Sequence, residues 1–191
     1  MHTELLALIA RTAPLNPADA AQCAECFRPL TLKKNTVVVA TGQVPSHLYF
    51  IRAGCMRLFY ATEQGEEATT HLGFSSDFMT PFLGFVQQQP AAESLATVTG
   101  CDVLGAAHAD LAAFIERSAA FKAFSLLIFE QALAAGAQRA NSLATLGAAQ
   151  RYGQLLARHP AVLLHVPVGQ VASFLGIRPE SLSRIRRQAN S

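Results

Sequence analysis

The feature that most constrains the fold is a run of short strand-like segments between residues 30 and 108. β-Branched and aromatic residues dominate these segments, and glycine, proline or charged residues separate them. The segments are Thr36–Ala40, His47–Arg52, Cys55–Ala61, Ala68–Gly73, Leu95–Val98 and Asp102–Gly105, with a hairpin tip at Glu63–Glu66. Strands spaced by about 8–12 residues are typical of an all-β sandwich or barrel.

Helical patterns flank this β region on both sides. Within residues 1–27, Asn16 is the predicted N-cap of a short helix whose first residue is Pro17. Beyond Ala109, a stripe recurs at steps of three and four and predicts a helix of about 25 residues. The stripe comprises Phe121, Ser125, Ile128, Ala132, Ala135, Arg139, Ser142 and Leu146. Such a long stripe favours self-association, and packing within one chain is the alternative.

Together these patterns predict an α+β protein with three parts. The first, at residues 1–117, is an N-terminal double-stranded β-roll (jelly-roll-like) sensor domain with its helices. A long dimerisation helix at 118–147 follows, and then a small, minimal helix-turn-helix domain at 148–191. Within the last part, Gln150–Arg158 is predicted as a helix and Leu163–Val166 as a brief β-like stretch.

Composition predicts a packed protein with an uneven charge distribution. Hydrophobic residues make up 51% of the chain and charged residues 15%, which excludes a disordered chain. From Gln150 to Ser191 there are six Arg and one acidic residue, a net charge of +5, whereas residues 1–149 carry −3. A basic tail on an acidic body is typical of a nucleic-acid reader joined to another domain. A solvated charged helix is the alternative.

The C-terminal segment from Val168 to Arg187 has the pattern of two helices joined by a tight turn. Ala172 is small where two helices approach closely, and Gly176 lies where the chain must turn. Leu182 forms part of the buried face of the second helix. This pattern predicts a helix-turn-helix with a polar, Arg-bearing outer face, and an ordinary helical corner is the alternative.

The outer face of the second helix carries the candidate DNA contacts. Arg184 suits guanine O6 and N7, and Glu180 can accept from cytosine N4. Arg186 and Arg187 suit phosphates, which position a protein on DNA without specifying sequence. The predicted DNA-binding residues are Arg178, Glu180, Ser181, Ser183, Arg184 and Arg187.

Nearly the full chain resembles the Crp/Fnr superfamily of bacterial transcription regulators. The segments that carry the resemblance are Leu48–Gly54, Arg57–Phe59, Ala172–Ile177 and Glu180–Arg184. The resemblance implies a sequence-specific DNA-binding transcription regulator that forms a homodimer through its long helix. Because Glu180, Ser183 and Arg184 are similar to the fumarate–nitrate branch, it also implies a two-fold site in double-stranded DNA. The half-sites would be TTGAT-like and about one helical turn apart.

The chain departs from the nucleotide-binding members of this superfamily at their ribose and phosphate contacts. Aligned on Asp77-Phe78, the family's Gly-Glu pair falls on Thr80-Pro81, and its Arg-Ser pair falls on Glu93-Ser94. A carboxylate repels a phosphate, and proline at the other position removes both a carboxylate and a backbone donor. We therefore expect a divergent member that binds neither cyclic AMP nor cyclic GMP.

An aromatic cluster in the predicted β-roll is the candidate pocket for an unknown small-molecule effector. The candidate residues are Phe74, Phe78, Met79, Phe82, Phe85, Glu93 and Ser94. Such a cluster either lines a pocket for an apolar effector or belongs to the core. A ligand-free protein that is constitutively competent for DNA binding is a third alternative.

No metal or other cofactor is expected. The fumarate–nitrate branch can hold an iron–sulfur cluster on four Cys, but here only Cys23 and Cys26 are close in sequence. Cys55 and Cys101 fall in predicted strands, where a free Cys is frequently a small buried hydrophobe. A haem site is not expected either, since a lone His in a strand is usually a plain surface or core residue.

Neither an enzyme nor a membrane protein is expected. The chain has no P-loop, Gly-x-Gly-x-x-Gly run, HExxH helix or GxSxG elbow. No apolar run reaches the roughly 18–20 residues that span a bilayer, and Met1–Glu4 lacks the positive region of a secretory signal. The expected location is the cytoplasm, in association with the nucleoid. The alternative function is a β-roll ligand-binding or protein-interaction module whose helical tail mediates assembly rather than DNA binding.

Overall fold

In the computed structural model, which describes residues 2–62 and 65–189, two antiparallel four-stranded sheets pack into a β-roll. The first sheet has the order β1 (Phe27–Leu32), β8 (Cys101–Ala107), β3 (His47–Ala53), β6 (Phe78–Met79). The second has the order β2 (Val37–Val39), β7 (Ser94–Thr97), β4 (Met56–Ala61), β5 (Glu67–Gly73). Ile51, Met56 and Val103 lie in the buried layer that joins the sheets. The predicted β-roll is confirmed, while Glu63 and Gln64 of the predicted hairpin tip lie outside the described residues.

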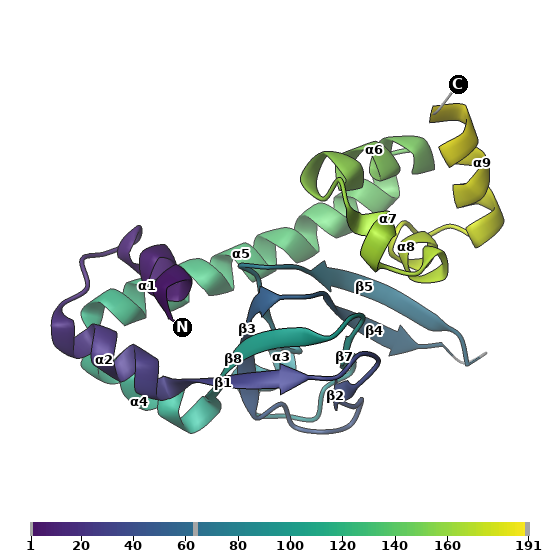
Figure 1. Cartoon of the computed structure of the whole chain (residues 1–191). Coiled ribbons are helices and arrows are strands. Elements are labelled where there is room, and N and C mark those ends of the chain that lie inside the picture. The colour runs from purple at the N-terminus through teal and green to yellow at the C-terminus, as the bar shows by residue number, and fades with distance from the viewer. Residues whose placement is uncertain (1, 63–64, 190–191) are drawn as a thin grey trace.

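Helices cover one end of this β-roll (Figure 1). They are α1 (Thr3–Ala10), α2 (Pro17–Cys26), α4 (His108–Arg117) and the first half of α5 (Ala119–Thr145), while the short α3 (Phe82–Gln87) follows β6. The side chain of Asn16 accepts the N–H of Asp19 at 2.8 Å, and Pro17 begins α2, as predicted. Phe114 and Phe121 stack 4.1 Å apart in the core beneath these helices.

Helix α5 is 27 residues long and runs from the N-terminal helices past the β-roll to the C-terminal helices (Figure 1). The hydroxyl of Ser118 caps it by accepting the N–H of Phe121 at 3.1 Å. The predicted stripe, however, faces its own chain. Phe121, Ser125 and Ile128 are buried in the core, and the later members of the stripe are half-buried. The expectation that this stripe mediates self-association is therefore wrong, because the β-roll and the C-terminal helices cover it.

Within the described residues, α5 is the one helix long and apolar enough to cross a membrane by length and composition. Lys122, Glu130 and Arg139 interrupt its apolar residues, so α5 contains no apolar run of roughly 18–20 residues, as expected from the sequence. The first half of α5 contributes to the protein core, because Phe124 and Ile128 pack beneath the N-terminal helices.

The C-terminal part consists of α6 (Ala148–Arg158), α7 (Val162–His165), α8 (Val168–Phe174) and α9 (Pro179–Ala189). Its core includes Leu155 and Val171 and continues onto Leu72 of β5. Residues 163–166 do not form the expected β-like stretch. The N–H of Val166 donates to the carbonyl of Val162 at 2.8 Å, and both side chains are buried. One helical turn buries this pair, because residues four apart lie on the same face.

The turn between β3 and β4 depends on the absence of a side chain at Gly54. Its φ is 101°, and a Cβ there would lie 2.4 Å from the carbonyl oxygen of Gly100. We expect Gly54→Ala to lower the free energy of unfolding by about 2–4 kcal/mol, because backbone strain and a backbone clash add. Gly42 is the matched control, since it has a φ of 85° with open space around it. Gly42→Ala should cost only about 1–2 kcal/mol in chemical denaturation, and equal losses would contradict the steric argument.

Candidate functional site

The tight turn between α8 and α9 has the geometry expected from the sequence. Gly176 has a φ of 66°, and the N–H of Ile177 donates to the carbonyl of Ala172 at 3.0 Å. Leu175 and Leu182 are buried on either side of the turn, together with Ala172. A glycine in the left-handed region after a helix is the common way to end it and redirect the chain.

The outer face of α9 carries the predicted DNA contacts. Arg178, Glu180, Ser183, Arg184 and Arg187 are exposed and Ser181 is half-buried. Within the described residues, the side chains of Arg178, Glu180, Ser183 and Arg184 enter no hydrogen bond or ion pair. Helix α9 lies at the end of the molecule away from the N-terminal helices (Figure 1). The structure thus brings the six residues together on one accessible surface.

Helix α8 docks on β5, the edge strand of the second sheet. The hydroxyl of Ser173 accepts the N–H of Thr69 at 2.9 Å and donates to the carbonyl of Glu67 at 2.9 Å. Arg139 of α5 donates to the carbonyls of Thr69 at 2.9 Å and Phe174 at 2.7 Å. These bonds satisfy backbone groups that an edge strand would leave unpaired. They also hold the C-terminal helices against the β-roll.

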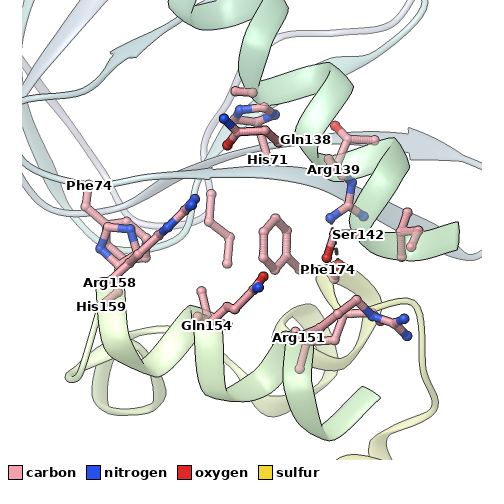
Figure 2. Close-up of a pocket in the computed structure, with 16 residues that line it drawn as sticks. His71, Phe74, Gln138, Arg139, Ser142, Arg151, Gln154, Arg158, His159 and Phe174 are labelled. Carbon is pink, nitrogen blue, oxygen red and sulfur yellow. Dashed lines mark hydrogen bonds between the residues drawn. The ribbon is translucent and has the colours of Figure 1, made fainter. Parts of the chain in front are cut away.

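A cavity of about 190 Å³ opens where β5, α5, α6 and α8 meet (Figure 2). Arg139 from α5 and Arg158 from α6 reach toward it from opposite sides, and the ring of Phe174 lies between them (Figure 2). Arg151, His71 and His159 also line it. The cavity therefore gathers basic side chains from both parts of the chain.

The positive charges of this cavity are close to one another. Burial, and then the neighbouring charge of Arg151, lower the pKa of Arg139. Arg151 donates to the carbonyls of Leu146 and Leu175, the latter at 3.0 Å. Neutral backbone oxygens thus take the hydrogen bonds of both guanidinium groups.

The histidines of the cavity contribute less charge than the arginines. Burial lowers the pKa of His71 and of His159, while the nearby carboxylate of Asp77 opposes the shift in both. Because a lowered pKa leaves a histidine mostly neutral at pH 7, the arginines supply the positive charge of the cavity at that pH.

A second, smaller cavity of about 120 Å³ is lined by two of the residues that align with the nucleotide contacts of the superfamily. Pro81 and Glu93 line it, together with Tyr60. Glu93 accepts a hydrogen bond from the hydroxyl of Thr70 at 3.0 Å, and burial raises the pKa of Glu93. Ser94 does not line this cavity. Its hydroxyl accepts the N–H of Thr41 at 2.9 Å. The cavity thus carries the carboxylate of Glu93, and no arginine is among its described lining residues.

The aromatic residues of the predicted effector pocket do not line one cavity. Phe85 is buried in the core beneath the N-terminal helices, and Phe78 and Phe82 pack against that core. Met79 lies in the layer between the two sheets. Phe74 alone among them lines the cavity between the β-roll and the C-terminal helices.

The four cysteines are buried and free. Burial raises the pKa of Cys23 to about 12 and that of Cys26 to about 11, which disfavours the thiolate that a metal requires. Cys55 and Cys101 lie in the β-roll, away from α2. Among the described residues no three His, Cys, Asp or Glu side chains gather in a way that could hold a metal ion.

Sequence reasoning missed the basic cavity. Arg139 was counted in a helical stripe that is otherwise small or apolar, and a charged residue in such a stripe is the signal that could have revealed it. Arg151 and Arg158 were counted only in the net charge of the basic tail, and the structure places them in the lining of the cavity. His71 and His159 gave no local signal, because only the fold brings them together.

A β-roll, a long helix and a C-terminal helix pair follow one another along the chain. Residues 29–118 match the family of cyclic nucleotide-binding domains. An uncharacterized protein of Haemophilus influenzae is 33% identical over 48 residues, which cover 25% of this chain and only 37% of that protein.

Solved structures of bacterial regulators share the whole fold. FixK2 from Bradyrhizobium japonicum matches with a TM-score of 0.77 and 13% identity over 86% of this chain and 84% of its own. A putative Crp/Fnr-family regulator from Eubacterium rectale gives 0.70 and 14% over 91% and 83%. CLP from Xanthomonas campestris, described as c-di-GMP responsive, gives 0.69 and 18% over 92% of both chains. Residues 29–118 thus resemble cyclic nucleotide-binding domains, and the chain has the fold of the solved Crp/Fnr regulators, as the resemblance drawn from its sequence implies.

Proposed function

We propose that the protein is a sequence-specific DNA-binding transcription regulator of the Crp/Fnr type, and not an enzyme. The observation that carries this proposal is the exposed outer face of α9, where Glu180, Ser183 and Arg184 engage no other described residue. A helix with such a face can enter the major groove and contact base edges through its N-terminal half. The fold that the chain shares with the putative Crp/Fnr-family transcriptional regulator from Eubacterium rectale supports the same function.

The regulator acts as a homodimer through the exposed face of α5. Leu126, Phe129, Leu133, Gly136 and Ala140 follow one another at steps of three and four, and we call them the exposed seam; Phe129 is half-buried against Phe82 and the other four are exposed. Leu126 is 56% exposed and Leu133 is 77% exposed. A seam with this spacing is typical of paired helices. Pairing two copies there would give the two recognition helices a fixed spacing, as a two-fold DNA site requires.

The regulator binds neither cyclic AMP nor cyclic GMP. The half-buried carboxylate of Glu93 and the ring of Pro81 line the cavity where the cyclic phosphate and ribose would lie. Repulsion between Glu93 and a phosphate, with no arginine to offset it, should prevent binding. Calorimetry at micromolar nucleotide should give no saturable heat with either nucleotide. A specific isotherm would contradict this prediction.

The regulator works in the cytoplasm, associated with the nucleoid, without an iron–sulfur cluster or haem. The chemistry and the placement of the cysteines support the proposal that no iron–sulfur cluster is bound. The thiols of Cys23 and Cys26 have raised pKa values and share α2, whereas Cys55 and Cys101 belong to the β-roll.

Fluorescence anisotropy tests the DNA-binding function. Wild-type protein is titrated against a palindromic duplex with two TTGAT-like half-sites and against a scrambled duplex, across a series of salt concentrations. The proposal predicts tighter binding to the palindrome, with affinity falling steeply as salt rises, because protein cations displace counterions from phosphates. Selection from a random duplex pool, with and without cell extract, separates a wrong half-site from an inactive state.

Failure of all of these titrations would overturn DNA binding. The result would favour a β-roll module whose helical tail only mediates assembly, since such a tail has neither a preference for one duplex nor a steep salt dependence.

A further inference from the structure

The cavity between the β-roll and the C-terminal helices gathers three arginines in its lining, while the nearby carboxylate of Asp77 interacts with its histidines. None of the described residues that line it is acidic. The one ion pair within residues 2–62 and 65–189 joins Arg57 to Glu67, both on the second sheet. Arg139, Arg151 and Arg158 thus share a partly enclosed space without a carboxylate partner in it. Gathering uncompensated charges costs free energy, which a bound anion would offset.

The same arginines retain unused donors. A guanidinium has five N–H groups in a planar fork. Arg139 uses two of its nitrogens on backbone carbonyls, and Arg151 does the same. The side chain of Arg158 makes no hydrogen bond or ion pair with any described residue. Forks of this kind pair best with the oxygens of a phosphate or a carboxylate.

The size of the cavity limits the ligand. Its volume of about 190 Å³ lies below the roughly 300–1,000 Å³ of pockets that hold drug-sized ligands. The enclosed part therefore suits a ligand smaller than a nucleotide. A small metabolite with two negative charges meets this limit. The rings of Phe74 and Phe174 provide an apolar wall for its carbon skeleton.

We propose that this cavity binds a small dianionic metabolite, a phosphate monoester or a dicarboxylate, which joins the C-terminal helices to the β-roll. Arg139 lies on α5, whereas Arg151 and Arg158 lie on α6, so one anion would contact both parts of the chain. Its binding would strengthen the contact of Ser173 and Arg139 with β5. The consequence for DNA, a fixed placement of α9, rests on the function proposed above. The binding itself does not.

Two variants test the site without touching the contacts that hold α8. Gln154 and Arg158 are exposed, line the cavity and donate no hydrogen bond within the described residues. Gln154→Glu adds a repelling carboxylate, and Arg158→Gln removes a donor fork. Arg117→Gln is the matched control, because Arg117 is exposed at the end of α4, away from the cavity.

Calorimetry with glycerol 3-phosphate and with succinate, at fixed ionic strength and without DNA, measures the binding. Glycerol is the neutral control. Saturable binding of either dianion, weakened about tenfold or more by each cavity variant and unchanged in Arg117→Gln, supports the site. The stronger of the two dianions identifies the chemical source. Absence of saturable binding up to about 10 mM of both, or equal binding by the cavity variants, overturns it.

Hydrogen–deuterium exchange tests the coupling between the two parts of the chain. With the stronger dianion bound, peptides covering residues 67–73 and 168–175 should exchange more slowly in the wild type and unchanged in Gln154→Glu. Binding without slower exchange would overturn the claim that the ligand joins the two parts. Neither measurement uses DNA, so a failure of DNA binding leaves both results interpretable.

Discussion

Replacing Leu133 with Glu is expected to convert the protein from a dimer to a monomer. Leu133 is 77% exposed in the single chain, and it lies at the centre of the exposed seam. Burying a leucine contributes about 1.5–3 kcal/mol, and a two-fold interface contains the residue twice. The loss of about 3–6 kcal/mol raises the dimer dissociation constant about 10²- to 10⁴-fold. Sedimentation across a concentration series measures the change, and binding to the palindromic duplex should fall with it.

A matched substitution separates this effect from general damage. Leu164 lies on α7, away from α5, and is 82% exposed. Leu164→Glu places the same charge at an equally exposed leucine, so it should leave the dimer and the DNA affinity intact. Each chain should keep its fold, and the two variants should have similar melting temperatures as monomers, because neither side chain is buried within the chain. A dimeric Leu133→Glu variant would show that the copies pair elsewhere or not at all.

The β-roll was predictable because its signals are local. β-Branched residues between turn residues predict each strand. A local sequence of about four residues, which includes Asn16 and Pro17, predicts the start of α2. The family resemblance supplied the order of the parts. The C-terminal turn was equally predictable from the sequence. Gly176 has the positive φ of the turn, and Ala172 is small and buried where the helices approach.

The face of α5 that is free for pairing was not predictable, because both faces of that helix carry apolar residues. Periodicity identifies a stripe, but it does not say whether the stripe meets its own chain or another. The stripe meets its own chain at both ends, since Ile128 packs in the core beneath the N-terminal helices and Arg139 donates to the carbonyl of Phe174 next to α8's docking site on β5. The basic cavity escaped detection for the same reason. Its residues come from β5, α5 and α6, and only the docking brings them together.

Arg184→Ala is expected to abolish discrimination between the palindromic and the scrambled duplex. Arg184 is exposed on α9, and a bidentate contact to guanine is worth about 1–3 kcal/mol. A two-fold site loses it twice, so affinity for the palindrome should fall at least about 30-fold. Affinity for the scrambled duplex should fall much less, because nonspecific binding depends on phosphate contacts.

Arg186→Ala on the same helix is the control for Arg184→Ala. Arg186 is assigned to a phosphate, so its loss should weaken binding to both duplexes by a similar factor and reduce the salt dependence of each. Arg117→Ala, far from α9, should change neither. Anisotropy titrations measure the affinity of the three variants for both duplexes. If Arg184→Ala weakens both duplexes equally, Arg184 contacts the backbone and another residue of α9 must specify the sequence. If it weakens neither, α9 is not the DNA-reading helix, and the proposed function loses the observation on which it rests.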